Sequence, residues 1–343
     1  MAVGSPPVED QVKKILVTGG AGYVGSCMVG RLLQEKYEVI VLDNLSMGHA
    51  SLVDKRAIFV KGDLRRHADI EKVFKKYKID AVMHFAASAY VGESVENPMK
   101  YYQNNVSAAV NLLNAMRAAK VTQLIFSSTC AVYGEPVKIP MAETHPKNPA
   151  NPYGRTKLAI EWMLKDLAES LPAGKRHAGF SYISLRYFNA CGAHSSGKIG
   201  EIHDPETHLV PNILKAAAGK KKKLVIFGDD FDTPDGSCVR DYIHVEDIAE
   251  AHLLALKALA RRVRNEAFNL GTGKGFSNFE ILKKTGEITG KKINYTIGPR
   301  RPGDPSRLIA DASKAKKILG WAPKRGLGQI IRSAWEWEKK ISK

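Results

Sequence analysis

Short apolar runs, rich in β-branched residues, alternate along the first half of the chain with longer amphipathic segments. The short runs predict β-strands and the longer segments predict helices. Strands separated by helices are typical of a parallel sheet that is covered on both faces. We therefore expect an α/β fold with a Rossmann-type, doubly wound parallel sheet. The expected strands are Ile15–Thr18, Val39–Asp43, Ile58–Lys61, Ala81–Phe85, Leu124–Ser128 and Tyr182–Tyr187.

The pattern loosens after Asn189, where the segment from Gly192 to Glu206 is rich in glycine, serine, histidine and acidic residues. Because 343 residues exceed what one hydrophobic core usually organises, we expect a second, smaller α/β lobe that binds the substrate. Beyond the loose segment we predict a helix at 209–218 and strands at 224–227, 242–245 and 267–270, the last two returning to the first sheet. The predicted division assigns residues 13–188 and about 238–272 to the sheet domain, 189–237 and 273–343 to the smaller lobe, and 1–12 to a flexible N-terminal extension.

A glycine-rich turn, Thr18–Gly25, follows the first expected strand and leads into an expected helix, Val24–Gln34. Glycines allow a pyrophosphate to approach the backbone, and its charge then faces the N–H groups at the helix start. Asp43 ends the second expected strand, where a carboxylate accepts hydrogen bonds from a ribose 2′-hydroxyl and repels a 2′-phosphate. The pattern therefore predicts bound NAD rather than NADP, although such a turn can be purely structural and Asp43 can simply open a turn.

Tyr153 and Lys157 lie one helical turn apart after Asn151 and Pro152, so we expect their side chains to share one face of a helix. For tyrosine to act as a base near neutral pH, its pKa must fall by roughly 3 units, or about 4 kcal/mol. A neighbouring ammonium group can contribute to that shift. The expected fifth strand ends near Thr129, whose hydroxyl can join the pair at the same edge of the sheet.

These motifs together resemble the UDP-glucose 4-epimerases of the extended short-chain dehydrogenase/reductase family, over Lys14 to Trp337. The resemblance implies an isomerase that interconverts UDP-glucose and UDP-galactose, with NAD held through turnover and a 4-keto intermediate. It also implies a homodimer formed by helices at 99–118 and 152–169. The further matching segments are Leu42–Leu45, Val91–Ser94, Ser127–Thr129, Arg186–Asn189, Val239–His244 and Arg300–Asp304.

The resemblance assigns roles to individual residues. The implied catalytic residues are Tyr153, Lys157 and Thr129. The implied NAD-binding residues are Gly19, Gly22, Tyr23, Val24, Gly25, Asp43, Asn44, Asp63, Leu64, Phe85, Ala86, Ala87, Asn104, Ser127, Tyr153, Lys157 and Tyr187. The implied substrate-binding residues are Thr129, Tyr153, Asn189, His208, Leu209, Val225, Phe227, Arg240, Arg301 and Asp304, with the two arginines on the diphosphate.

Departures from the family pattern concern the substrate. Thr129 replaces a serine and keeps the hydroxyl, whereas Cys130 and Ala131 supply no carboxylate, which disfavours a dehydratase. Ala89 and Leu308 leave UDP-pentoses and N-acetylated UDP-sugars open as substrates. The remaining alternatives are a net oxidoreductase and a non-catalytic nucleotide-sugar-binding regulator.

Charge and cysteine usage narrow the setting. The chain has 52 Lys and Arg against 35 Asp and Glu, a net charge of +17, but no aromatic pattern of nucleic-acid binding accompanies it. An apolar span and a signal peptide are both absent, so we expect a cytoplasmic protein with neither membrane nor nucleic-acid partners. The four scattered cysteines favour reduced thiols.

Histidines follow Asn189 in the loose segment. His194, His203 and His208, with Glu201, have a spacing that fits no zinc pattern, and we therefore expect no metal.

Overall fold

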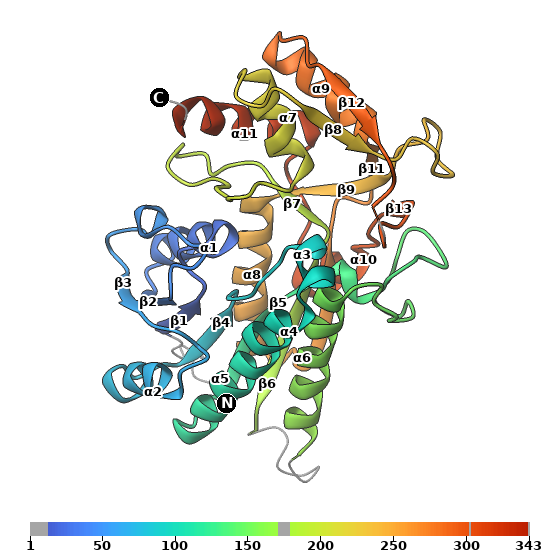
Figure 1. Ribbon diagram of the computed structural model, residues 1–343. Helices are drawn as coiled ribbons and strands as arrows, with labels where there is room; N and C mark the ends of the chain where they lie inside the picture. Colours follow the sequence, from blue (N-terminus) through green and yellow to red (C-terminus); the bar gives the residue numbers. More distant parts are fainter. Residues whose placement is uncertain (1–12, 171–178, 302, 342–343) are drawn as a thin grey trace, which may run out of the picture.

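A seven-stranded sheet forms the larger part of the protein, in a computed structural model that describes residues 13–170, 179–301 and 303–341. All of its strand pairs are parallel, in the order β10-β6-β5-β4-β1-β2-β3 (Figure 1). The fold class predicted from the sequence is therefore confirmed, and all six strands expected in the first half are present. Their bounds, with that of β10, are β1 Lys14–Thr18, β2 Glu38–Asp43, β3 Ile58–Lys61, β4 Ala81–His84, β5 Gln123–Thr129, β6 Ser181–Tyr187 and β10 Glu266–Leu270.

Both faces of this sheet are buried, because neighbouring residues of one strand enter different cores. Val17 of β1 packs in a core with residues of α1 and α8, whereas Leu16 packs in a core with residues of α2, α5 and α6. The uninterrupted apolar runs of the sequence follow from this two-sided burial. The helices are α1 Tyr23–Gln34, α2 His67–Lys76, α5 Ala108–Ala118, α6 Pro152–Glu169 and α8 Val245–Ala260.

The helix expected at 99–118 is interrupted. The structure has α3 Val91–Glu96, α4 Pro98–Tyr101, a π-helical segment Tyr102–Ser107, and then α5. π-helical turns are rare and are frequently found at functional sites. Here Asn105, within the π-helical segment, is fully buried and bonds both the Ser88 backbone and Thr156.

A second group of elements lies above the carboxyl edge of the main sheet (Figure 1). In it β9 pairs with β11, β13 and β7, and β12 pairs with β8. A third core forms between these strands and α7, α9 and α11. The elements of this group are β7 Asn189–Cys191, α7 Leu209–Ala217, β8 Leu224–Phe227, β9 Val239–His244, β11 Gly275–Ser277, α9 Asn278–Thr289, β12 Tyr295–Gly298, β13 Arg307–Leu308 and α11 Leu327–Ile341. The helix α10 Ser313–Leu319 instead packs on β10 and α8 of the main sheet domain. The short 3-10 helices are Ala50–Leu52 and Cys130–Val132.

One expectation about the chain path is wrong. Of the two strands predicted to return to the first sheet, β10 does so beside β6, but β9 belongs to the second sheet. The reason is that β9 already has partners on both sides there, and only the following helix, α8, packs back on the main sheet. The division into two domains stays a prediction, and its extension, residues 1–12, lies outside the described residues.

Within the described residues, none of the helices combines the length and the apolar character that crossing a membrane requires.

Candidate active site

The glycine-rich turn is closed so tightly that side chains cannot enter it. Gly19 has a φ of +74°, and a Cβ there would lie 2.5 Å from the Ala86 nitrogen. A Cβ on Gly25 would overlap the carbonyl oxygen of Gly19. Gly22 caps α1 without a side-chain hydrogen bond, and the first turn of α1 holds no acidic residue. The turn therefore presents bare backbone to an anion, and these features fit the pyrophosphate of a dinucleotide.

Two carboxylates lie at the edge of this turn. Asp43 accepts hydrogen bonds from the backbone N–H groups of Ala21 (3.0 Å) and Leu45 (2.9 Å), so its position is fixed by the turn itself. Asp63 accepts a bond from the Asn44 amide (3.2 Å). The Arg65 guanidinium beside Asp63 holds the pKa of that carboxyl well below its usual range. Both carboxylates therefore lie beside the glycine-rich turn, each held by hydrogen bonds from neighbouring residues.

The segment after β4 lies against the same turn. Phe85 and Ala86 donate backbone hydrogen bonds to the Thr18 carbonyl at 2.9 and 3.1 Å. Asn104 bonds Ser88 at 3.1 Å, in the loop that follows. Phe85 is followed by Ala86, Ala87 and Ser88, so three consecutive small side chains lie along this segment.

Two other residues that were expected to contact NAD have side chains that interact within the protein core. Leu64 is buried in the core beneath β2, at 7% exposure. The Tyr187 hydroxyl lies 2.8 Å from His252 Nε2, inside the core.

Tyr153, Lys157 and Thr129 come together where β5 ends and α6 begins. Asn151 caps α6 by accepting a bond from the Gly154 N–H (2.9 Å), and Pro152 occupies the first turn. Lys157 is buried and donates to the Ser127 carbonyl at 2.7 Å. Tyr153 is only partly buried. A partly buried tyrosine therefore lies one helical turn from a buried lysine.

The electrostatics of this pair differ from the sequence-based expectation. Burial raises the pKa of Tyr153 to about 12, although a hydrogen bond with Thr129 opposes the shift. Burial also lowers the pKa of Lys157 to about 7, while Glu161 opposes that shift. The protein's own groups therefore do not bring the pKa of Tyr153 toward neutrality, because desolvation outweighs the hydrogen bond with Thr129.

A buried ion pair behind Lys157 escaped the sequence analysis. Glu161 accepts bonds from Arg186 Nε (2.9 Å) and Nη2 (2.5 Å) and from the Ser128 hydroxyl (2.6 Å). Arg186 also donates to the Tyr133 hydroxyl at 2.8 Å. Glu161 lies one turn beyond Lys157, and this spacing of charges on one helix face was the available signal.

The expected substrate residues of the second lobe partly converge. Asp304 Oδ2 accepts from Arg301 Nε at 2.8 Å, and Asp304 Oδ1 lies 3.8 Å from Arg240 Nη2. The Arg301 guanidinium lies 5.4 Å from the centroid of the Phe227 ring. Val225 is two residues from Phe227 on β8, and thus on the same face. These side chains make a cationic site with one aromatic wall.

Asn189 begins β7 and Leu209 begins α7, both elements of the second group. His208, directly before Leu209, belongs to a different cluster.

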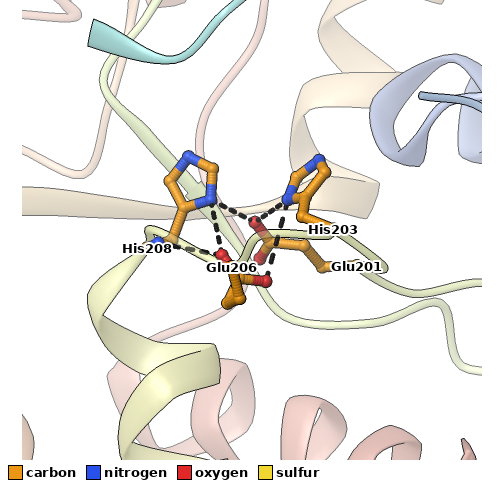
Figure 2. A group of neighbouring side chains, drawn as sticks. All are labelled: Glu201, His203, Glu206 and His208. Atoms are coloured by element: carbon orange, nitrogen blue, oxygen red, sulfur yellow. Dashed lines mark hydrogen bonds and ion pairs between the residues drawn. The ribbon is translucent and has the colours of Figure 1, made fainter. Parts of the chain in front are cut away.

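In that cluster, four side chains between β7 and α7 converge (Figure 2). His208 Nδ1 lies 2.8 Å from Glu201 and 3.0 Å from Glu206, and His203 Nδ1 lies 3.0 Å from Glu201. Burial disfavours a charged His208, but the two carboxylates outweigh it and raise the pKa of that ring to about 10. Sequence reasoning grouped His194 with these histidines and missed Glu206; His194 instead lies 3.6 Å from Glu246.

Comparison with known proteins gives one family. The sequence model of the NAD dependent epimerase/dehydratase family matches residues 15–271. The chain is 50% identical over 333 residues to the UDP-glucose 4-epimerase of Lactobacillus helveticus, covering 96% of this chain and 98% of that protein. It is similar to the crystal structure of UDP-glucose 4-epimerase from Brucella ovis in complex with NAD (TM-score 0.89, 48% identity, 94% and 97% covered). It is also similar to the enzyme from Bifidobacterium longum in complex with NAD⁺ and UDP (TM-score 0.90, 38% identity, 96% and 99% covered).

Proposed function

The chain belongs to the NAD dependent epimerase/dehydratase family, among its UDP-glucose 4-epimerases, and from this premise we propose that Tyr153, Thr129 and Lys157 act on C4 of a UDP-sugar. The protein is an NAD-dependent isomerase that interconverts UDP-glucose and UDP-galactose. The observation that carries the residue assignment is Tyr153 in hydrogen-bond contact with Thr129, one helical turn from the buried Lys157, at the carboxyl edge of the main sheet.

NAD lies, in this proposal, across the edge of the sheet where the glycine-rich turn, Asp43 and the segment after β4 meet. The backbone N–H groups at the start of α1 would bind the pyrophosphate, and Asp43 would accept hydrogen bonds from the adenosine ribose. The cradle that no Cβ can enter, at Gly19 and Gly25, supports this placement. Bound NAD supplies a hydride acceptor and donor for C4 and a positive charge that favours the phenolate.

Tyr153 takes the proton of the sugar 4-hydroxyl and later returns it. Thr129 forms a hydrogen bond with the oxygen of the sugar 4-hydroxyl. Lys157, in its protonated form, stabilises the Tyr153 phenolate. The resulting 4-keto sugar must turn in the cleft before its other face is reduced, so no net redox change occurs. A dehydratase needs an additional acid and base, which Cys130 and Ala131 do not offer.

The UDP group binds, in this proposal, to the cationic site of the second lobe. Arg240 and Arg301 neutralise the diphosphate, because guanidinium groups match its oxygens in geometry and charge. Phe227 provides a face for uracil. Asp304 holds both arginines in place, which supports a prepared anion site rather than two mobile surface charges.

The test is to incubate the purified protein with UDP-galactose and no added NAD, with NMR for the sugar and absorbance at 340 nm for NADH. We expect UDP-glucose to form without lasting NADH. Accumulated NADH with a keto product would instead indicate a net oxidoreductase. Conversion only of UDP-xylose or N-acetylated UDP-sugars would move the substrate to the alternatives that Leu308 and Ala89 leave open.

A homodimer belongs to the same proposal. Large apolar side chains are exposed on α3, α4 and α6, which pack on one another: Val95 at 53%, Met99 at 63% and Trp162 at 59%. Soluble proteins seldom leave such groups together in water, and a second copy of this chain would cover them.

We place the protein in the cytoplasm, which the four free, buried cysteines support.

A further inference from the structure

Glu201, His203, Glu206 and His208 lie within one eight-residue stretch before α7, and we propose that they form a binding site for a single divalent transition-metal ion, best matched by Zn²⁺. The site is separate from the residues to which the reaction is assigned above, apart from His208. It does not depend on the proposed roles of Tyr153 or the arginines.

The donor atoms converge on one point. One atom from each of the four side chains lies within 4.8 Å of every other. The measured N–O pairs are 2.8, 3.0, 3.0 and 3.8 Å. A tetrahedral Zn²⁺ with bonds of about 2.0 Å separates its ligands by about 3.3 Å. The three shorter N–O pairs lie within about 0.5 Å of that spacing, and the wider pairs, up to 4.8 Å apart, would have to close on the ion.

Hydrogen bonds alone satisfy this arrangement poorly. Glu201 Oε1 faces both rings, and each Nδ1 faces two carboxylates although it carries at most one proton. His203 Nδ1 is buried and makes no hydrogen bond of acceptable geometry, despite its 3.0 Å distance from Glu201. A metal ion accepts all of these lone pairs at once.

Charge also favours a cation. The side chains of Glu201 and Glu206 are only 8% and 4% exposed. Among the described residues, no lysine or arginine forms an ion pair with either carboxylate. Metal ligation requires deprotonated imidazoles, so a divalent ion would replace the proton that His208 holds between Glu201 and Glu206 and would neutralise both carboxylates.

The donor set selects the kind of metal. Two imidazole nitrogens and two carboxylate oxygens suit Zn²⁺ and its neighbours in the first transition row. Mg²⁺ and Ca²⁺ prefer oxygen ligands alone. We therefore expect Zn²⁺ to bind this site even when Mg²⁺ is present in excess.

The neighbours of the cluster indicate what the metal would do. The Tyr90 ring, just after β4, contacts both histidine rings, at centroid distances of 5.6 and 6.2 Å. Trp337 of α11 donates to the Glu201 carbonyl at 2.9 Å. A metal here would tie the loop before α7 to elements of both sheets, and its role would be structural.

The test uses the purified full chain with its resident NAD. After dialysis against a chelator, Zn²⁺ is added back, bound metal is counted by mass spectrometry, and thermal unfolding is followed. We expect one Zn²⁺ per chain and a higher melting temperature. Co²⁺ substitution should give the intense visible absorption of a tetrahedral site.

Two variants and one control make the result specific. Glu206→Gln and His203→Gln should each lower Zn²⁺ affinity at least about 100-fold, since each removes a direct ligand. His194→Gln, a histidine of the same segment outside the cluster, should bind like the wild type. Far-UV circular dichroism and NAD content report whether each variant is folded. The proposal fails if the wild type binds no stoichiometric Zn²⁺, or if both folded variants retain it.

Discussion

At the scale of single residues, burial decides the state of the reacting groups. Tyr153 and Lys157 lie in desolvating surroundings, so each is driven toward its neutral form. The spacing that puts them on one face of α6 could be predicted, but the burial that shifts their pKa values depends on residues packed from β5.

Replacing Tyr153 with phenylalanine removes the proton acceptor while keeping the ring. We expect turnover of UDP-galactose to fall by about 10²–10⁴-fold or more. NAD content and UDP affinity should stay close to wild type, as judged by cofactor release and calorimetry. Tyr295→Phe, on an exposed strand of the other lobe, serves as the control. Loss of NAD from the Tyr153 variant would contradict the assigned role.

Buried histidines make stability depend on pH. His252 is fully buried between the Tyr187 hydroxyl and the Ile248 carbonyl, and burial lowers its pKa to about 4. In the unfolded chain the His252 imidazole has a pKa near 6.5, so below that pH the unfolded state binds more protons than the folded state. Folding stability is therefore lost as the pH falls from about 6.5 toward 4, by up to about 3 kcal/mol for this residue.

The His252→Asn variant should be less stable at pH 7, because two hydrogen bonds are disturbed, yet its stability should fall less between pH 6.5 and 4. Urea unfolding at several pH values measures this. His67→Asn, on the exposed face of α2, should keep the wild-type profile. An unchanged slope in the His252 variant would mean that other groups dominate acid unfolding.

At the scale of elements, the glycine-rich turn and the start of α1 together form the proposed pyrophosphate-binding site. The sequence predicted both, since the glycines directly follow an expected strand and open an expected helix. What it could not predict is which backbone closes against each glycine: Ala86 for Gly19, and Gly19 itself for Gly25. The π-helical segment at Tyr102–Ser107 was equally hidden, because periodicity does not distinguish one added residue in a turn.

A Gly25→Ala substitution should open this turn, because the new methyl group would overlap a carbonyl oxygen. We expect loss of most bound NAD and lower stability, measured by released NAD per chain and by thermal unfolding. Gly286→Ala, inside α9, meets only an ordinary contact at 3.5 Å and should leave NAD content unchanged. Full retention of NAD in the Gly25 variant would contradict the proposal that this turn binds the pyrophosphate.

At the scale of the whole molecule, the exposed apolar side chains on α3, α4 and α6 lead to the proposed homodimer. Trp162→Glu places a charge there and should convert the protein from the mass of two 37.7-kDa chains to that of one, by light scattering. Val137→Glu, at a more exposed apolar position outside α3, α4 and α6, is the control. A monomeric wild type, or a variant that stays dimeric, would contradict the dimer.

The sequence by itself determined the parallel sheet, the glycine-rich turn, and the Tyr153–Lys157 pair, because each follows from local spacing and strand–helix periodicity. Only the tertiary structure decided that β9 leaves the main sheet, that Arg186 reaches Glu161, and that Glu206 joins two histidines. Strand partners and buried charge pairs depend on residues far apart in the chain or on the path of an irregular loop. Local patterns carry no information about either.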